Sequence, residues 1–200
     1  MTWTPPDDLD VLRSHIAERL VAAVTDRDAG WRTPTFATVG VDGGPRARTV
    51  VLRAIDNDRR RLVIYTDRRS AKIREIGVID RVALSFWDSR ANQQLRITGR
   101  ASVVLPGPEV SAAWDALPVA SRLPYLAELA PGAHPTRPEA GWPDNAGDPL
   151  TDTDAGRAVF ALLAVAWTDW DWLWLGQNGH RRAHWHWGPA DDLRGDWVVP

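Results

Sequence analysis

The stretch RTVVLR, residues 48–53, places four apolar or β-branched residues between two arginines. Because side chains alternate along a strand, this pattern predicts a buried strand with Arg48 on one face and Arg53 on the other. The simplest explanation is that both arginines lie at strand ends and reach solvent. The alternative is that an anionic group lies across the strand.

The surrounding residues predict further strands, joined by short turns. The expected strands are residues 33–41, 45–55, 61–66, 81–87, 93–105, 159–167, 170–175 and 180–187. Helices are expected at residues 7–25, 70–76, 108–117 and 121–129, with a loop rich in Pro, Gly and Asp at residues 131–157. Short strands linked by turns favour an antiparallel, mainly β architecture with flanking helices over alternating βαβ units. No repeat or domain boundary is visible, so residues 1–200 are expected to form a single domain.

The composition excludes several classes of protein. The chain has 44% hydrophobic residues, a net charge of −2 and no cysteine. We therefore expect no disulfide, no thiolate metal site and no general attraction to nucleic acid or membranes. The N-terminus does not resemble a signal peptide, and the longest apolar run (159–167) is too short to span a bilayer. These features predict a cytoplasmic protein.

The residues YTDRRSAK (65–72) end one predicted strand and begin a helix. Ser70 is a suitable N-cap, and a helix N-terminus offers free backbone N–H groups and a positive dipole end. Thr66, Ser70 and Lys72, which is the only lysine in the chain, could then bind a phosphate. The alternative is an ordinary N-capped surface helix.

Several stretches together resemble a known family. They are RTVVLR (48–53), YT (65–66), SAK (70–72), FW (86–87), QQLRITGRA (93–101) and a C-terminal pattern of tryptophans and arginines that ends in WVVP. In this order they resemble the pyridoxamine 5′-phosphate oxidase-like flavoproteins, in particular the branch of related FMN-binding proteins. The resemblance implies an FMN-binding split β-barrel of antiparallel, Greek-key type, and a homodimer with FMN at the interface.

The resemblance also assigns residues to the cofactor and the substrate. The implied FMN-binding residues are Arg48, Thr49, Val50, Val51, Leu52, Arg53, Tyr65, Thr66, Ser70, Lys72, Gln94, Trp174 and His184, with Trp172 as a rival to Trp174. The implied substrate-binding residues are Arg53, Ser121 and Arg182. Arg48 would serve the phosphate end of FMN, and Arg53, about 16 Å further along one strand, the isoalloxazine end. The chain departs from the family at Arg53, where the oxidases have lysine, and at Ala71, where the family has arginine.

The implied function is a two-electron oxidation or reduction of a small molecule by FMN, with no catalytic side chain required. The family default substrate is pyridoxamine or pyridoxine 5′-phosphate. One alternative is an FMN reductase-like or other flavin oxidoreductase that acts on a different substrate. Another is a non-catalytic flavin- or haem-binding protein.

Two groups of aromatic and histidine residues allow other interpretations. Trp170, Trp172 and Trp174 share one strand face, and at least two of them are expected in the core or a dimer interface. An exposed platform would instead suggest a carbohydrate-binding module. His184 and His186 also share a face and could cooperate, but the histidines are too spread along the strand to predict a metal site.

Overall fold

The computed structural model describes residues 3–136, 152–190 and 192–200. Nine strands of the described residues form one antiparallel sheet. They are β1 (Thr35–Val39), β2 (Pro45–Thr49), β3 (Leu52–Asp56), β4 (Arg61–Asp67), β5 (Arg81–Asp88), β6 (Gln93–Val103), β7 (Phe160–Trp174), β8 (Arg181–Trp187) and β9 (Leu193–Val198). The mainly β, antiparallel architecture with flanking helices is therefore confirmed.

The helices flank this sheet. They are α1 (Leu9–Thr25), α2 (Ala71–Val78), α3 (Pro108–Asp115), α4 (Val119–Arg122) and the 3₁₀ segments η1 (Leu123–Leu126) and η2 (Asp154–Ala158). Helix α1 begins after Asp8, whose carboxylate accepts hydrogen bonds from the backbone N–H groups of Asp10 and Val11. No helix among the described residues is long and apolar enough to cross a membrane.

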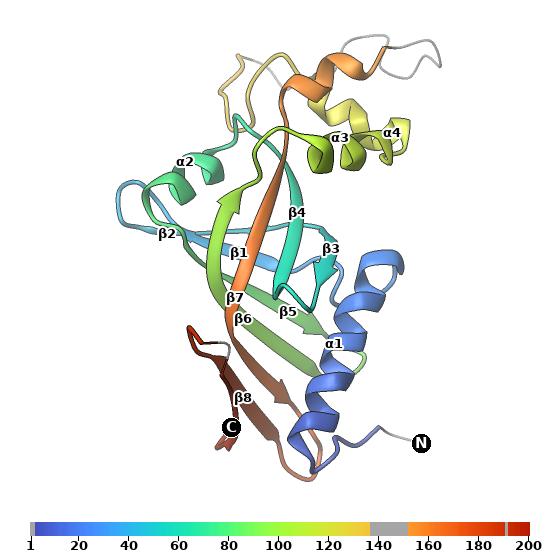
Figure 1. Ribbon diagram of the computed structural model, residues 1–200, viewed down its shortest axis with the longest axis vertical. Coiled ribbons are helices and arrows are strands. Elements are labelled where there is room, and N and C mark those ends of the chain that lie inside the picture. The colour runs from blue at the N-terminus through green and yellow to red at the C-terminus, as the bar shows by residue number, and fades with distance from the viewer. Residues whose placement is uncertain (1–2, 137–151, 191) are drawn as a thin grey trace.

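Strand β7 connects the two halves of the molecule. The order of the sheet is β2-β1-β5-β6-β7-β4-β3, and β8 and β9 follow on from β7. Residues 160–166 of β7 pair with β4, and residues 169–174 pair with β8. As a result, α2, α3 and α4 lie toward one end of the molecule, and β8 and the N-terminus lie toward the other (Figure 1).

The RTVVLR stretch is not one continuous strand, so the predicted strand 45–55 was wrong. The chain leaves β2 after Thr49 and enters β3 at Leu52. The backbone N–H groups of Val50 and Leu52 donate to the carbonyls of Pro34 and Arg32, which continues the register of the β1–β2 pairing, but Pro34 has no N–H to donate back, so the regular ladder ends at Thr49. Strand β2 then pairs with β1, and β3 pairs with β4.

Three other sequence expectations need correction. The predicted strands 159–167 and 170–175 form the single strand β7, and β9 was not predicted. The predicted helix 121–129 is replaced by α4 and η1, because Pro124 cannot continue an α-helix. Most of the predicted loop 131–157 lies outside the described residues.

The core contains most of the tryptophan side chains. Trp170 and Trp172 are 2% and 0% exposed, and they belong to the main core cluster, which also includes Trp185 and the buried side chains of α1. This confirms that at least two of the three alternating tryptophans lie in the core. A second, smaller cluster forms around Trp114 and Phe160, next to α3.

Candidate phosphate cradle and flavin-facing residues

Thr66, Ser70 and Lys72 meet where β4 turns into α2, and we call these three residues the cradle. The Lys72 Nζ donates to the hydroxyl oxygens of Thr66 at 3.0 Å and Ser70 at 3.1 Å. The two hydroxyl oxygens are 3.2 Å apart. Thr66 and Ser70 are only 6% and 3% exposed. The cradle therefore combines one ammonium group with two hydroxyl groups, a chemistry suited to a phosphate.

The position of Ser70 leaves the start of α2 available to a ligand. Ser70 is the N-cap residue, but its hydroxyl makes no capping hydrogen bond and bonds within the cradle instead. The first backbone N–H groups of a helix have no intrahelical acceptor. Burial, and to a lesser extent the charge of Arg48, lowers the pKa of Lys72. A bound anion would offset this penalty on the charged ammonium.

Arg48 lies beside the cradle but is already paired. Its guanidinium donates to the Glu75 carboxylate at 2.7 Å and to the Thr38 hydroxyl at 2.5 Å. Thr38 donates to the same carboxylate oxygen of Glu75 at 2.6 Å. The sequence did not predict this pairing, because it depends on β2 pairing with β1 rather than with β4.

Arg53 lies on β3, in a different environment. Its guanidinium carbon is 5.4 Å from the centre of the Tyr65 ring, and Tyr65 packs against Phe160 at 5.2 Å. Arg53 makes no hydrogen bond or ion pair with a described residue. The positive charge of Arg53 is therefore available to a ligand that lies against Arg53 and Tyr65.

The remaining residues of RTVVLR divide between surface and core. Thr49 is exposed and Val51 is half-buried, whereas Val50 and Leu52 lie in the main core cluster. The side chains of Val50 and Leu52 thus support the strands, and only their backbone could face a cofactor.

Gln94, Arg182 and His184 form a second group on β6 and β8, on the face of the sheet opposite the core. Leu173 of β7 lies between Gln94 of β6 on one side and Arg182 of β8 on the other. His184 of β8 is opposite Asp171 of β7. Arg182 is held by Asp171 through two hydrogen bonds of 3.0 and 2.7 Å. Arg96 also pairs with Asp171.

His184 belongs to a cluster centred on Asp169. One carboxylate oxygen of Asp169 lies 3.5 Å from Nε2 of His184 and 2.7 Å from Nδ1 of His186. Thr98 and Thr168 donate to the other oxygen. Partial burial opposes ionisation, but the hydrogen bonds from Thr168, His186 and Thr98 outweigh it and lower the pKa of Asp169. The Asp169 carboxylate thus hydrogen-bonds His186 and lies close to His184.

The two candidate tryptophans have different surroundings. Trp172 is fully buried, and its indole N–H donates to Gln93 at 3.2 Å. Trp174 is half-buried and lines a cleft of about 1020 Å³ together with Trp3, His15 and Arg181. Only Trp174 is therefore accessible to a ligand, although it lies on the opposite face of the sheet from Gln94 and His184.

The cradle and the second group are far apart within one chain. Thr66 is opposite Ala161 near the start of β7, whereas Gln94 is opposite Leu173 near its end. Twelve residues of strand correspond to about 40 Å. A mononucleotide held by the cradle cannot reach Gln94 or Trp174 of the same chain.

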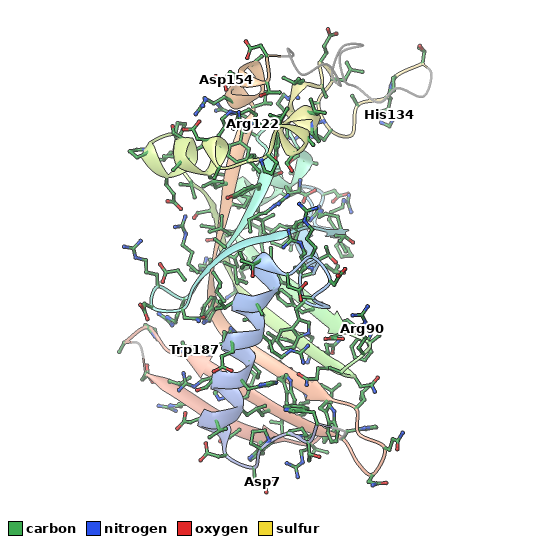
Figure 2. The ribbon with its side chains drawn as sticks, turned by 90° about the vertical axis from the view of Figure 1, so that its right-hand side faces the viewer. Asp7, Arg90, Arg122, His134, Asp154 and Trp187 are labelled. Atoms are coloured by element: carbon green, nitrogen blue, oxygen red, sulfur yellow. The ribbon has the colours of Figure 1, made fainter. Side chains whose placement is uncertain are left out.

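The candidate substrate residue Ser121 lies on α4, near the end of the molecule that carries Arg122 and Asp154 (Figure 2). Arg122 donates to the carbonyls of Leu117 and Asp115 and lies 5.4 Å from the centre of the Trp114 ring. Tyr125 packs against Phe160 at 5.2 Å, and burial raises the pKa of Tyr125 to about 12. The sequence analysis did not predict a role near the site for Tyr125, Glu75 or Asp171. Each of them contacts a residue that is distant in the sequence, and nothing in the local sequence indicates such a contact.

The chain is similar to known flavoproteins. Residues 11–105 match the family model "Pyridoxamine 5'-phosphate oxidase, FMN-binding domain". A pyridoxine/pyridoxamine 5′-phosphate oxidase of Thermosynechococcus vestitus is 39% identical over 88 residues, which cover 44% of this chain and 40% of that protein. A Myxococcus xanthus enzyme of the same name is 36% identical over 96 residues, or 48% of this chain and 44% of that protein. The chain thus matches less than half the length of these two relatives.

Two solved structures share the fold. A pyridoxamine 5′-phosphate oxidase-related, FMN-binding protein of Nostoc punctiforme has a TM-score of 0.74 and 23% identity, and the match covers 94% of this chain and 96% of that one. PhzG of Burkholderia lata, solved with tetrahydrophenazine-1-carboxylic acid, has a TM-score of 0.67 and 19% identity, over 98% and 94% of the two chains. These similarities confirm the split-barrel fold expected from the sequence.

Proposed function

The chain is a relative of the pyridoxamine 5′-phosphate oxidase FMN-binding proteins, and from this premise we propose that it is an FMN-dependent oxidoreductase acting on a small molecule. The observation that carries the proposal is the cradle. Its two buried hydroxyls and its ammonium surround the N-terminus of α2, in the part of the chain that matches the FMN-binding domain. These groups fit the phosphate of FMN.

The proposed complex is a homodimer with FMN between the subunits. One chain would supply the cradle and RTVVLR, and the other would supply Gln94 and His184 from one face of its sheet and Trp174 from the opposite face, at the end of β7. The support for this arrangement is the distance of about 40 Å between the two groups along β7. Since a single chain holds only half of the proposed contacts, a second copy would complete each site.

In this complex, the side chains bind and orient while the flavin, when bound, supplies the two-electron chemistry. Lys72 and the two hydroxyls would hold the phosphate. Arg53 would lie beside the isoalloxazine ring and stabilise the negative charge that the ring gains on reduction. Tyr65 would fix the direction of the Arg53 guanidinium through its ring.

The default substrate of the family is pyridoxamine or pyridoxine 5′-phosphate, with Arg53, Ser121 and Arg182 as its contacts. A different small-molecule substrate is a second candidate, and a specific observation favours it. Arg182 is paired with Asp171, and Arg122 donates to two backbone carbonyls. These two guanidinium groups are therefore already engaged, so a second phosphate would find fewer free cations here.

The first test is an absorbance spectrum of the purified protein, with the chromophore released by acid and identified. We expect FMN at about one per chain. Pyridoxamine 5′-phosphate would then be added without oxygen. Bleaching of the flavin would identify the default substrate, and a stable yellow colour would favour another substrate or a non-catalytic binder. A colourless protein that binds no added FMN would contradict the proposal.

A further inference from the structure

Glu75 is a buried carboxylate next to the cradle. It is 5% exposed and lies in the middle of α2, four residues after Ala71. One of its oxygens accepts hydrogen bonds from both Arg48 and Thr38. Thr38 also accepts from Arg48, so the three side chains form a closed triangle that joins α2 to β1 and β2.

Most of the positive charge around the cradle is compensated. Glu75 neutralises Arg48, and Asp67 binds Arg69 through both carboxylate oxygens. Lys72 is different, because its hydrogen-bond partners among the described residues are the two hydroxyls of the cradle. Arg68 and Arg74 are exposed, so solvent and salt screen their charges. Among the described residues at the β4–α2 turn and on α2, Lys72 is thus the half-buried cation that lacks a carboxylate partner.

We propose that Glu75 sets the affinity of the cradle for the flavin phosphate by compensating the charge of Arg48. The inference rests on the proposed function, because it assumes that the cradle holds the phosphate of FMN. In the protein as it stands, Lys72 provides the main charge interaction with the phosphate. The Glu75 carboxylate limits the affinity, since it repels the phosphate and withdraws Arg48 from it.

The Glu75→Gln variant isolates this effect. Glutamine keeps an oxygen that can accept from Arg48 and Thr38, but it carries no charge. We expect FMN to bind more tightly to this variant, on the order of tenfold at low salt. Riboflavin lacks the phosphate, so its affinity should not change. The dependence of FMN binding on salt should become steeper, because one more uncompensated cation faces the phosphate.

The experiment titrates the full-length chain, freed of flavin, with FMN and with riboflavin at two salt concentrations, using quenching of flavin fluorescence. Glu18→Gln is the matched control, since it removes an exposed carboxylate on α1 and should leave both affinities unchanged. The double variant Arg48→Gln/Glu75→Gln removes both charges of the pair. It should not show the gain in FMN affinity that Glu75→Gln alone produces, because the uncompensated guanidinium is then absent.

The outcomes separate this inference from the proposed function. A wild-type chain that binds FMN no better than riboflavin would overturn the phosphate cradle, and the role of Glu75 with it. A wild-type chain that prefers FMN, together with a Glu75→Gln variant that does not bind FMN more tightly, would overturn the role of Glu75 alone. An equal gain for riboflavin would also contradict it, since the effect would then not depend on the phosphate.

Discussion

Asp88 shows how one carboxylate can tie a helix to the sheet. It ends β5 and accepts a hydrogen bond of 2.5 Å from Arg19 of α1. It also accepts from the backbone N–H groups of Arg90 and Ala91, which shapes the turn before β6. Burial opposes ionisation, but these hydrogen bonds and the charge of Arg19 outweigh it, so the pKa of Asp88 is lowered.

The lowered pKa gives a stability prediction with a defined sign. A carboxylate whose pKa is lower in the folded state stabilises the protein above its unfolded pKa of about 3.9, and this contribution disappears as the pH falls through the folded value. Asp88→Asn should therefore lower the free energy of unfolding by about 1–3 kcal/mol at pH 7. The difference from wild type should shrink under strongly acidic conditions.

Urea unfolding at a series of pH values would measure this difference. Asp10→Asn is the control, because it breaks an exposed i,i+3 ion pair with Arg13 and should have a small effect. A difference between Asp88→Asn and wild type that stays constant at all pH values would show that the charge of Asp88 is not what stabilises the fold.

At the scale of elements, the β6–β7 ladder contains an irregularity that the sequence did not indicate. The register shifts between Thr98 and Gly99, and β7 continues through Thr168 where the sequence predicted a break. The backbones approach closely at this point. A Cβ atom on Gly99 would lie 2.1 Å from the carbonyl oxygen of Ala166. Only glycine fits here without a shift of the strand.

Gly99→Ala should therefore destabilise the protein by about 1–3 kcal/mol, because the added methyl group meets backbone that cannot move aside. Gly77→Ala is the matched control, since a Cβ at Gly77 of α2 would meet nothing within 4 Å. This control should be neutral or slightly stabilising. Thermal denaturation compares the two, and equal melting temperatures would contradict the close approach at Gly99.

At the scale of the whole molecule, β7 separates the two halves of the proposed site. The cradle lies near its first residues, and Trp174 is its last residue. If two chains complete each site, one subunit can carry a substitution in the cradle while the other carries a substitution at Trp174. Each mixed dimer then contains one site with both contacts intact.

This arrangement predicts complementation between two variants. Lys72→Met and Trp174→Ala should each bind FMN weakly when purified alone. When the two variants are mixed, unfolded and refolded together, about a quarter of all sites should regain wild-type affinity. FMN titration of the mixture measures this fraction. Trp172→Ala provides a contrast, since that side chain is buried in the core and its loss should lower stability. A mixture that behaves as the sum of the two variants would contradict shared sites.

Local sequence was enough to predict the features that depend on neighbouring residues. The apolar spacing of residues 7–25 predicted α1, and the alternation in residues 93–98 predicted which side chains of β6 face the core. The cradle was also predictable, because Thr66, Ser70 and Lys72 lie within seven residues of one another and a single strand–turn–helix connection brings them together.

The tertiary structure decided what depends on strand pairing. RTVVLR divides between two strands because the β1–β2 ladder lacks a donor at Pro34, and the chain pairs with β4 from Leu52 onward. Arg48 therefore pairs with Glu75, 27 residues away, and Arg182 pairs with Asp171 of a neighbouring strand. The sequence by itself determined the type of most elements and the polar groups near the cradle, because backbone preferences and hydrophobic periodicity act over a few residues. Only the folded chain determined which charges are compensated, because the partner of a buried charge is chosen by the packing of distant segments.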